Sequence, residues 1–235
     1  MPTAPAPQVL AFDVFGTVVD WHGSIVRELR ALYPQVDGDA FALAWRAGYQ
    51  PAMQRVRSGE IGWTTIDALH RMILDEELLP RFGLTHVDES ARAHLNRVWH
   101  RLDPWPDVVA GLARLKRRFT ICTLSNGNLA LLAAMAKRAA LPWDLILSAE
   151  VFRAYKPDPA AYLGVARVFG IEPSEVMLVA AHHDDLAAAR ACGLATAYVE
   201  RPLEFGAGQV KDVSLVAANT LHARDFGDLA RQLGA

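Results

Sequence analysis

The sequence predicts an α/β fold, in which a Rossmann-like parallel sheet has helices on both faces and an inserted helical cap. Three observations support this prediction. Short apolar runs of strand length recur along the chain, and segments of helical pattern lie between them. This alternation is typical of a parallel sheet covered by helices. Residues 21–100 break the alternation, because their pattern is helical throughout.

The first strand is expected at Val9–Phe12, where an apolar run stops at Asp13 and Gly16. Four further apolar runs predict the other strands of the sheet: residues 119–124, 145–147, 176–181 and Ala195–Val199. Each run is short and bounded by polar or turn-forming residues, as buried strands are.

Two of the helices between these strands have recognisable ends. Asp158 and Pro159 are the residue types that favour an N-cap and the first helical position, and Gly170 is typical of the end of that helix. Asp185 lies at the start of another helix, which Gly193 is expected to close. Both helices therefore begin just after a strand or a short loop.

The helical block contains four segments of helical pattern: residues 24–32, 39–57, 63–78 and 88–101. The block separates the first strand from the rest of the sheet. We therefore expect a helical cap of residues 21–100 that covers the ends of the strands. Residues 1–20 and 101–235 would form the Rossmann-like catalytic core.

The composition excludes several classes of protein. Apolar residues make up 52% and charged residues 21%, the balance of a soluble globular protein. A net charge of −2 without basic runs argues against nucleic acid and membrane surfaces as partners. The start, MPTAPAPQ, lacks the regions of a secretory signal, and Cys122 and Cys192 form no CxxC pair. We expect a cytoplasmic protein without a disulfide framework or a zinc site.

Four polar residues that are distant in sequence are expected to converge. Asp13, Ser125 and Asp185 would each lie at the carboxyl end of a strand, and Lys156 would follow a strand by a short loop. Ligands of parallel sheets bind beyond these strand ends. The sequence therefore predicts a site that contains two carboxylates, a hydroxyl and an ammonium group.

The order of the motifs DVFGT, SNG, YKP and HHDDL resembles the haloacid dehalogenase superfamily. Within it, FDVFGTVVDW, TLSNGN and YKPDPAAY are similar to the L-2-haloacid dehalogenases of type II. The resemblance covers nearly the whole chain. It implies a Rossmann-like core with an inserted cap, and hydrolysis of short 2-haloacids without metal or organic cofactor. Relatives often pair as dimers, which makes a homodimer a candidate state by analogy.

The resemblance assigns roles to the strand-end residues. Asp13 would be the nucleophile that attacks the substrate α-carbon, expels halide and forms an ester, which water then hydrolyses. This attack inverts the α-carbon, so an L-2-haloacid would give a D-2-hydroxyacid. Lys156 would keep Asp13 ionised, and Asp185 would hold Lys156 and help to activate water. Thr17 and Ser125 would bind the substrate carboxylate or position Asp13.

The resemblance also implies residues around the leaving halide. Arg46 matches the family's halide-side arginine, Asn126 matches its partner, and Tyr162 matches a tyrosine near the site. Trp63 is assigned to the same region as an aromatic edge for an anion. The pattern AAHHDDLAAAR resembles a subgroup with a histidine near the leaving group.

That last resemblance leads to a hypothesis about the halide. His182 or His183 would add a hydrogen-bond donor for a small halide, and the sequence does not decide which of them faces the site. Fluoroacetate and chloroacetate would then be substrates.

A metal-dependent phosphatase of the same superfamily is the first alternative. Phosphatases have a second aspartate where this chain has Phe15, and a Gly-Asp pair where it has Ala180 and Ala181. Mg²⁺ requires oxygen ligands in near-octahedral geometry, so these apolar residues favour metal-free displacement at carbon. The doublet Asp184-Asp185 resembles an acidic pair of some phosphatases and keeps this alternative open.

A non-catalytic binding protein on the same scaffold is the second alternative. It would be expected to have lost part of the site, whereas Asp13, Thr17, Ser125 and Lys156 are all present. The sequence therefore favours an enzyme.

Overall fold

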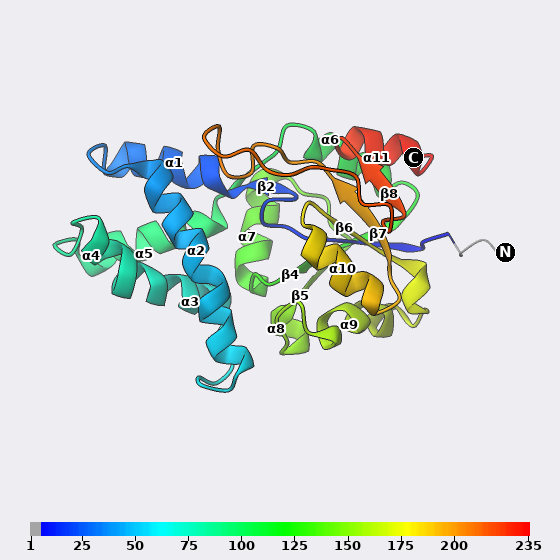
Figure 1. Cartoon of the computed structure of the whole chain (residues 1–235), viewed down its shortest axis with the longest axis horizontal. Coiled ribbons are helices and arrows are strands. Elements are labelled where there is room, and N and C mark those ends of the chain that lie inside the picture. The colour runs from blue at the N-terminus through cyan, green and yellow to red at the C-terminus, as the bar shows by residue number, and fades with distance from the viewer. Residues whose placement is uncertain (1–5) are drawn as a thin grey trace.

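The computed structural model describes residues 6–235, and its centre is a six-stranded sheet in which all neighbouring strands are parallel (Figure 1). The strands are β1 (Val9–Phe12), β4 (Thr120–Ser125), β5 (Leu145–Ser148), β6 (Val176–Ala180), β7 (Ala195–Val199) and β8 (Leu221–Ala223). Their order in the sheet is β5-β4-β1-β6-β7-β8. The predicted α/β class is confirmed, and all five predicted strands are present. The short edge strand β8 was not predicted, because three residues carry too weak a pattern.

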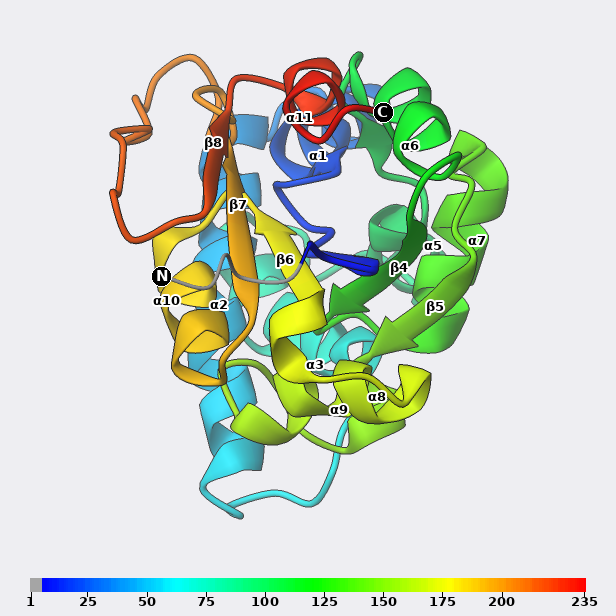
Figure 2. The same cartoon turned by 90° about the vertical axis from the view of Figure 1, so that its right-hand side faces the viewer.

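Helices cover both faces of the sheet, as Figure 2 shows. In β1, Leu10 and Phe12 belong to one buried apolar cluster, whereas Val9 and Ala11 belong to another. Successive side chains of a strand point to opposite faces, so β1 is buried from both sides. The helices of this part are α6 (Val108–Leu115), α7 (Leu129–Ala139), α8 (Ala149–Phe152), α9 (Pro159–Phe169), α10 (His183–Ala191) and α11 (Phe226–Gln232), with a 3₁₀ turn η3 (Pro173–Glu175).

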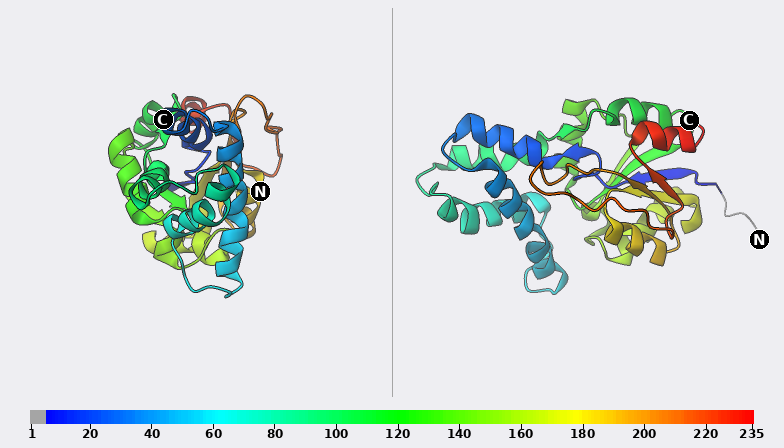
Figure 3. Two further views of the ribbon diagram at one scale, coloured as in Figure 1. Left: turned by 90° about the vertical axis from the view of Figure 1, so that its left-hand side faces the viewer. Right: turned by 45° about the horizontal axis from the view of Figure 1, so that its top comes forward.

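A block of helices lies beyond one end of the sheet (Figures 1 and 3). Its elements are α1 (Trp21–Leu32), α2 (Gly38–Arg57), α3 (Ile66–Ile73), η1 (Leu74–Leu78), α4 (Leu79–Arg81), α5 (Glu89–Asn96) and η2 (Arg97–His100). The chain enters the block through β2 (Val19–Asp20) and leaves it through β3 (Asp103–Pro104), and these two strands pair antiparallel. We propose that residues 21–100 act as the cap of the core.

The cap helices differ in detail from the sequence prediction. The helix expected at residues 63–78 begins at Ile66, and its last part, Leu74–Leu78, is a π-helical turn. The helix expected at residues 88–101 ends in a 3₁₀ turn at Arg97–His100. Within residues 6–235, no helix combines the length and the apolar character that crossing a bilayer requires.

Candidate active site

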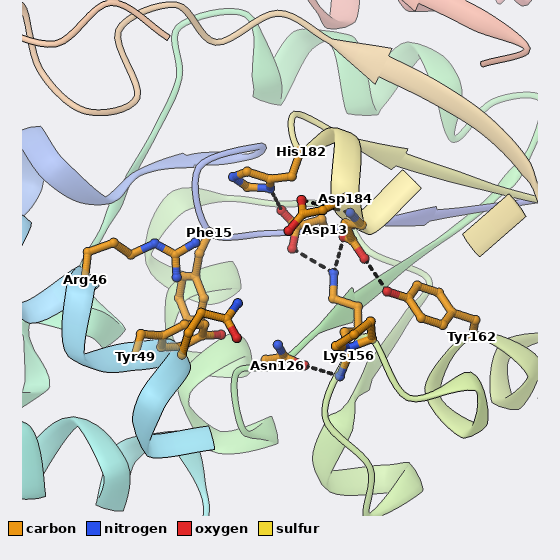
Figure 4. Close-up of a pocket in the computed structure, with 12 residues that line it drawn as sticks. Asp13, Phe15, Arg46, Tyr49, Asn126, Lys156, Tyr162, His182 and Asp184 are labelled. Atoms are coloured by element: carbon orange, nitrogen blue, oxygen red, sulfur yellow. Dashed lines mark hydrogen bonds and ion pairs between the residues drawn. The ribbon is translucent and has the colours of Figure 1, made fainter. Parts of the chain in front are cut away.

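Three charged side chains meet at the carboxyl end of the central strands (Figure 4). Asp13 follows β1 directly, and its backbone N–H donates to the carbonyl oxygen of Val179 at 3.0 Å. Asp185 lies in the first turn of α10, and Lys156 lies in the loop between α8 and α9. The Lys156 Nζ atom is 2.9 Å from Asp13 Oδ1 and 2.5 Å from Asp185 Oδ2. One ammonium group thus bridges two carboxylates.

The surroundings of the two carboxylates shift their pKa values in opposite directions. Burial raises the pKa of Asp13, but the charge of Lys156 and the bonds from His182 and Thr17 outweigh it and hold the pKa far below its usual range. Burial, together with the Asp13 charge, raises the pKa of Asp185. Burial would lower the pKa of Lys156, yet the two carboxylates raise it above its ordinary value. Asp13 is therefore an ionised carboxylate at neutral pH, and Asp185 is the more basic of the pair.

Two hydroxyl groups orient these carboxylates. The Thr17 hydroxyl donates to Asp13 Oδ2 at 2.7 Å and accepts the backbone N–H of Ala181 at 2.9 Å. The Tyr162 hydroxyl donates to Asp185 Oδ1 at 2.7 Å. Since both hydroxyl groups are held by fixed elements, the carboxylates cannot rotate freely.

The SNG turn after β4 supports the lysine. Asn126 accepts the backbone N–H of Lys156 through Oδ1 at 2.8 Å, so its amide nitrogen points the other way, toward the pocket (Figure 4). Ser125 is fully buried, and its Oγ accepts the backbone N–H of Gly127 at 3.0 Å. Ser125 does not line the pocket. It shapes the turn that carries Asn126.

A pocket of about 160 Å³ lies between this cluster and the cap. Drug-sized ligands occupy pockets of roughly 300–1,000 Å³, so this volume suits a much smaller molecule. The pocket lining comes from both parts of the chain: Asp13, Phe15, Asn126, Lys156, Pro157, Tyr162, His182, Asp184 and Asp185 from the core, and Arg46, Tyr49 and Gln50 from α2. A substrate in the pocket would contact both the core and helix α2 of the helical block.

Arg46 is the cap's cation in this pocket. Its guanidinium lies over the ring of Tyr49 at 4.6 Å from the ring centroid, and also near Trp21 at 5.8 Å. No ion pair joins Arg46 to a carboxylate of residues 6–235. A half-buried guanidinium that forms no ion pair with residues 6–235 is suited to bind an anion from solution.

Four of the predicted site residues lie outside the pocket lining: Thr17 and Ser125, which act behind it, and Trp63 and His183. Trp63 stacks on the ring of Tyr155 at 4.8 Å between centroids. His183 stacks on Tyr198, with 4.2 Å between ring centroids. The adjacent His182 does line the pocket, so the structure distinguishes the two histidines that the sequence left equivalent.

Phe15 fills the position at which phosphatases have their second aspartate. Its ring lines the pocket and packs against Trp99, with 5.6 Å between ring centroids. Asp184 is exposed at the mouth. In the described part of the chain, no three His, Cys, Asp or Glu side chains are grouped so that they could hold a metal ion. The donor set around Asp13 does not fit a Mg²⁺ cage.

Three residues near the site were missed in the sequence. Tyr49 and Gln50 lie three and four positions after Arg46, so the helical period could have placed them on its face. Glu204 is fully buried behind His182, in the loop after β7, and no motif marks it. Gly16 has a φ of 86°, and a Cβ there would collide with the Glu204 carboxylate. The lack of a side chain at Gly16, the glycine of DVFGT, thus leaves room for the Glu204 carboxylate.

The chain has clear relatives. Residues 7–193 match the family model described as haloacid dehalogenase-like hydrolase. The (S)-2-haloacid dehalogenase of Xanthobacter autotrophicus is 30% identical over 207 residues, which are 83% of this chain and 75% of that protein.

Two crystal structures are more similar in sequence. The L-2-haloacid dehalogenase PA0810 is 47% identical, with a TM-score of 0.92 over 97% of this chain and 100% of its own. The defluorinating L-2-haloacid dehalogenase Rha0230 is 46% identical, with a TM-score of 0.93 over 97% of this chain and 96% of its own. The similarity includes both the sheet and the helical block.

Proposed function

The chain belongs to the haloacid dehalogenase-like hydrolase family, and we propose from this premise that it is an (S)-2-haloacid dehalogenase. Its substrates would be short 2-haloacids, which it hydrolyses through an ester on Asp13. One observation carries this proposal: an ionised, lysine-paired carboxylate faces a small pocket whose opposite wall holds an arginine without a carboxylate partner within residues 6–235.

The first step forms the ester. A carboxylate oxygen of Asp13 attacks the substrate α-carbon from the side opposite to the halogen, and the halide leaves with the bonding electron pair. The configuration at the α-carbon inverts. Lys156 keeps Asp13 ionised until this attack, because its ammonium group lies 2.9 Å from Oδ1.

The second step releases the product. A water oxygen attacks Cγ of the Asp13 ester and gives its proton to Asp185, the more basic carboxylate of the pair. Cleavage between Cγ and the ester oxygen returns the Asp13 carboxylate, which now contains one oxygen atom of that water. The departing alkoxide takes the proton from Asp185 and becomes the hydroxyl group of the 2-hydroxyacid. The second proton of the water leaves the new Asp13 carboxyl group for the solvent.

Arg46 and Asn126 are proposed to hold the departing halide. Both direct N–H groups at the pocket, one from the cap and one from the core (Figure 4). The hypothesis of a histidine donor lacks support in the contacts. His183 lies outside the lining, and both ring nitrogens of His182 face protein carboxylates.

Replacement of Arg46 by lysine is the sharpest test of the halide site. Lysine keeps the charge but loses the planar fork, so kcat/KM should fall roughly 10- to 100-fold, as a lost hydrogen bond to a charged group costs about 1.5–3 kcal/mol. Steady-state halide release measures this change. Arg55→Lys is the matched control on the same helix, because Arg55 pairs with Glu60 and should tolerate the exchange. Equal rates for wild type and Arg46→Lys would remove Arg46 from the halide site.

Halide release from a panel of acids tests the function itself. Fluoro-, chloro- and bromoacetate and both enantiomers of 2-chloropropionate are incubated with the enzyme, and each halide is measured with an ion-specific method. We expect turnover of the haloacetates and of the (S) enantiomer, with D-lactate as its product, in the presence of EDTA. Cleavage of phosphate esters that depends on Mg²⁺, without halide release, would instead establish the phosphatase alternative.

Fluoroacetate is proposed as a substrate because the chain is 46% identical to a defluorinating enzyme over nearly its whole length. Fluoride is measured with a fluoride electrode. Since His183 is remote from the pocket, His183→Ala should leave the ratio of chloride to fluoride release unchanged. A changed ratio would return His183 to the halide site.

A further inference from the structure

His182 is clamped between two carboxylates. Its Nδ1 lies 3.2 Å from Asp13 Oδ2, and its Nε2 lies 2.9 Å from Glu204 Oε1 and 3.1 Å from Oε2. An ionised carboxylate can only accept hydrogen bonds, so each ring nitrogen must bear a hydrogen atom. The geometry therefore describes His182 as an imidazolium cation.

Glu204 is the fixed anion behind this ring. Its side chain is fully buried and accepts from Trp21 Nε1 at 3.2 Å, from His182 and from the ammonium group of Lys211. Burial raises the pKa of Glu204, but His182 and Lys211 reduce it to about 2. Burial lowers the pKa of His182, but Glu204 and Asp13 raise it to about 9. Both groups are charged at neutral pH.

The two oxygen atoms of Asp13 are therefore not equivalent. Oδ2 accepts from both Thr17 and His182, whereas Oδ1 accepts from Lys156. Oδ2 has two donors and Oδ1 has one, so we assign the attack on carbon to Oδ1. After this attack Oδ1 is the ester oxygen and Oδ2 is the carbonyl oxygen.

We propose that His182 is a catalytic residue that stabilises the oxyanion formed on Asp13 Oδ2 during ester hydrolysis, and that Glu204 is its positioning residue. This inference rests on the proposed function. When water adds to Cγ, the π electron pair of the carbonyl moves onto Oδ2, where Thr17 O–H and His182 Nδ1–H receive it. Collapse of this intermediate restores the carbonyl bond and expels the alkoxide of the product.

Glu204→Gln tests the role of the anion. Glutamine has the shape of glutamate without its charge, so the ring loses the partner that keeps it cationic. Ester hydrolysis should slow roughly 10- to 100-fold, since loss of a whole oxyanion donor costs about 10²–10³ in rate. Ester formation should change much less. Rapid-quench measurements should then show a burst of one halide per site, and intact-protein mass spectrometry should show the ester.

Substrates with different halogens distinguish oxyanion stabilisation from hydrogen bonding to the departing halide. Chloroacetate and bromoacetate form the same ester on Asp13, so the slow phase of Glu204→Gln should have one rate for both. A halide donor would instead alter the burst rate, and by an amount that depends on the halide. His182→Gln, which keeps a neutral N–H donor, should accumulate the same ester and provides a second test if Glu204→Gln fails to fold.

A second histidine–glutamate pair supplies the matched control. His222 Nε2 is 2.8 Å from Glu200 Oε1 at the edge of the same sheet, and neither residue lines the pocket. Glu200→Gln should leave both steps at the wild-type rate. This control also shows whether loss of a partly exposed histidine partner at the sheet edge slows the enzyme.

The pH dependence of ester hydrolysis gives an independent readout. Asp13 and Glu204 face the His182 ring, Lys211 and Arg46 act on Glu204, and Asp184 lies in the same pocket lining. Because the pKa of His182 is raised to about 9, its charge is present below that pH and is lost above it. In the ester, Asp13 has no charge, so only Glu204 still raises the pKa of His182 and the charge is lost below pH 9. Wild-type hydrolysis should fall as the pH rises towards 9, and hydrolysis by Glu204→Gln should fall at a lower pH than in the wild type.

The outcomes distinguish this inference from the proposed function. If wild type releases no halide, the proposed function fails. If wild type works through the Asp13 ester, but Glu204→Gln and His182→Gln slow both steps equally or accumulate no ester, only the role of the His182–Glu204 pair is wrong.

Discussion

Replacement of Asp13 by asparagine is expected to abolish halide release, with a loss of roughly 10⁴-fold or more, as for other enzymes that lose their nucleophile. The amide has no charge, and its nitrogen has no lone pair available for attack on carbon. The Lys156 ammonium group beside it would then lack a nucleophile to pair with. Halide release after incubation with chloroacetate measures the effect, and Asp13→Ala excludes recovery through deamidation of the asparagine.

Asp184→Asn is the matched control for this experiment. Asp184 is exposed, and the Lys156 ammonium group pairs with Asp13 and Asp185 instead of with it. The metal-free route predicts that this variant retains most of the wild-type rate, whereas a Mg²⁺-dependent phosphatase that used the Asp184-Asp185 pair would lose activity.

A single turnover in ¹⁸O-labelled water locates the ester. With enzyme in excess over substrate, the label should enter the Asp13 carboxylate, because water attacks Cγ of the ester. Peptide mass spectrometry detects the label in the segment that contains Asp13. Label in the hydroxyacid after one turnover would contradict the ester route and indicate direct attack of water on the α-carbon.

Replacement of Lys156 by methionine has the second-largest expected effect, on both activity and stability. Removal of one partner from a buried ion pair costs about 3–5 kcal/mol, and Lys156, which is 6% exposed, is the shared partner of Asp13 and Asp185. Halide release should fall by roughly 10³-fold, about 4 kcal/mol in activation free energy. Denaturant unfolding measures the stability, and steady-state kinetics measures the activity.

The activity of Lys156→Met should depend on pH in a direction that follows from the pKa of Asp13. In the wild type the pKa of Asp13 is lowered, so its contribution to stability and activity is present above the unfolded value and is lost only in strong acid. Without Lys156, only His182 and Thr17 offset the effect of burial, so the pKa of Asp13 should be higher than in the wild type. The acidic limb of the activity profile should move to higher pH.

Lys116→Met is the control for loss of a lysine–aspartate pair. The Lys116 side chain is 39% exposed and pairs with Asp144 at the surface, where such pairs contribute about 0–1 kcal/mol. A loss in Lys156→Met no larger than in Lys116→Met would contradict the role of Lys156 in the site.

The accuracy of the sequence prediction differed between elements. The strand before Asp13 was predictable, because four consecutive apolar residues followed by aspartate and glycine indicate a buried strand and a turn. The ends of α9 were predictable as well. Asp158 accepts the backbone N–H of Ala160, and Gly170 has a φ of 65°, as their residue types indicated.

The cap was harder to predict in detail. The bounds of α3 were wrong because its amphipathic pattern extends into a loop before Ile66 and a π-helical turn after Ile73. The position of Trp63 could not be inferred from pattern alone, since an aromatic residue has the same appearance in a pocket and in a stack on Tyr155.

By itself, the sequence determined the α/β class, the strand that presents Asp13 and the convergence of Asp13, Lys156 and Asp185. These features follow from local periodicity and from the rule that parallel strands end at one edge of a sheet. The tertiary structure alone decided which histidine faces Asp13 and which anion holds it. Glu204 lies 22 positions from His182 in a loop without a motif, so only the fold brings this carboxylate to the ring. Distant contacts of this kind depend on the path of the whole chain and not on the pattern of either segment.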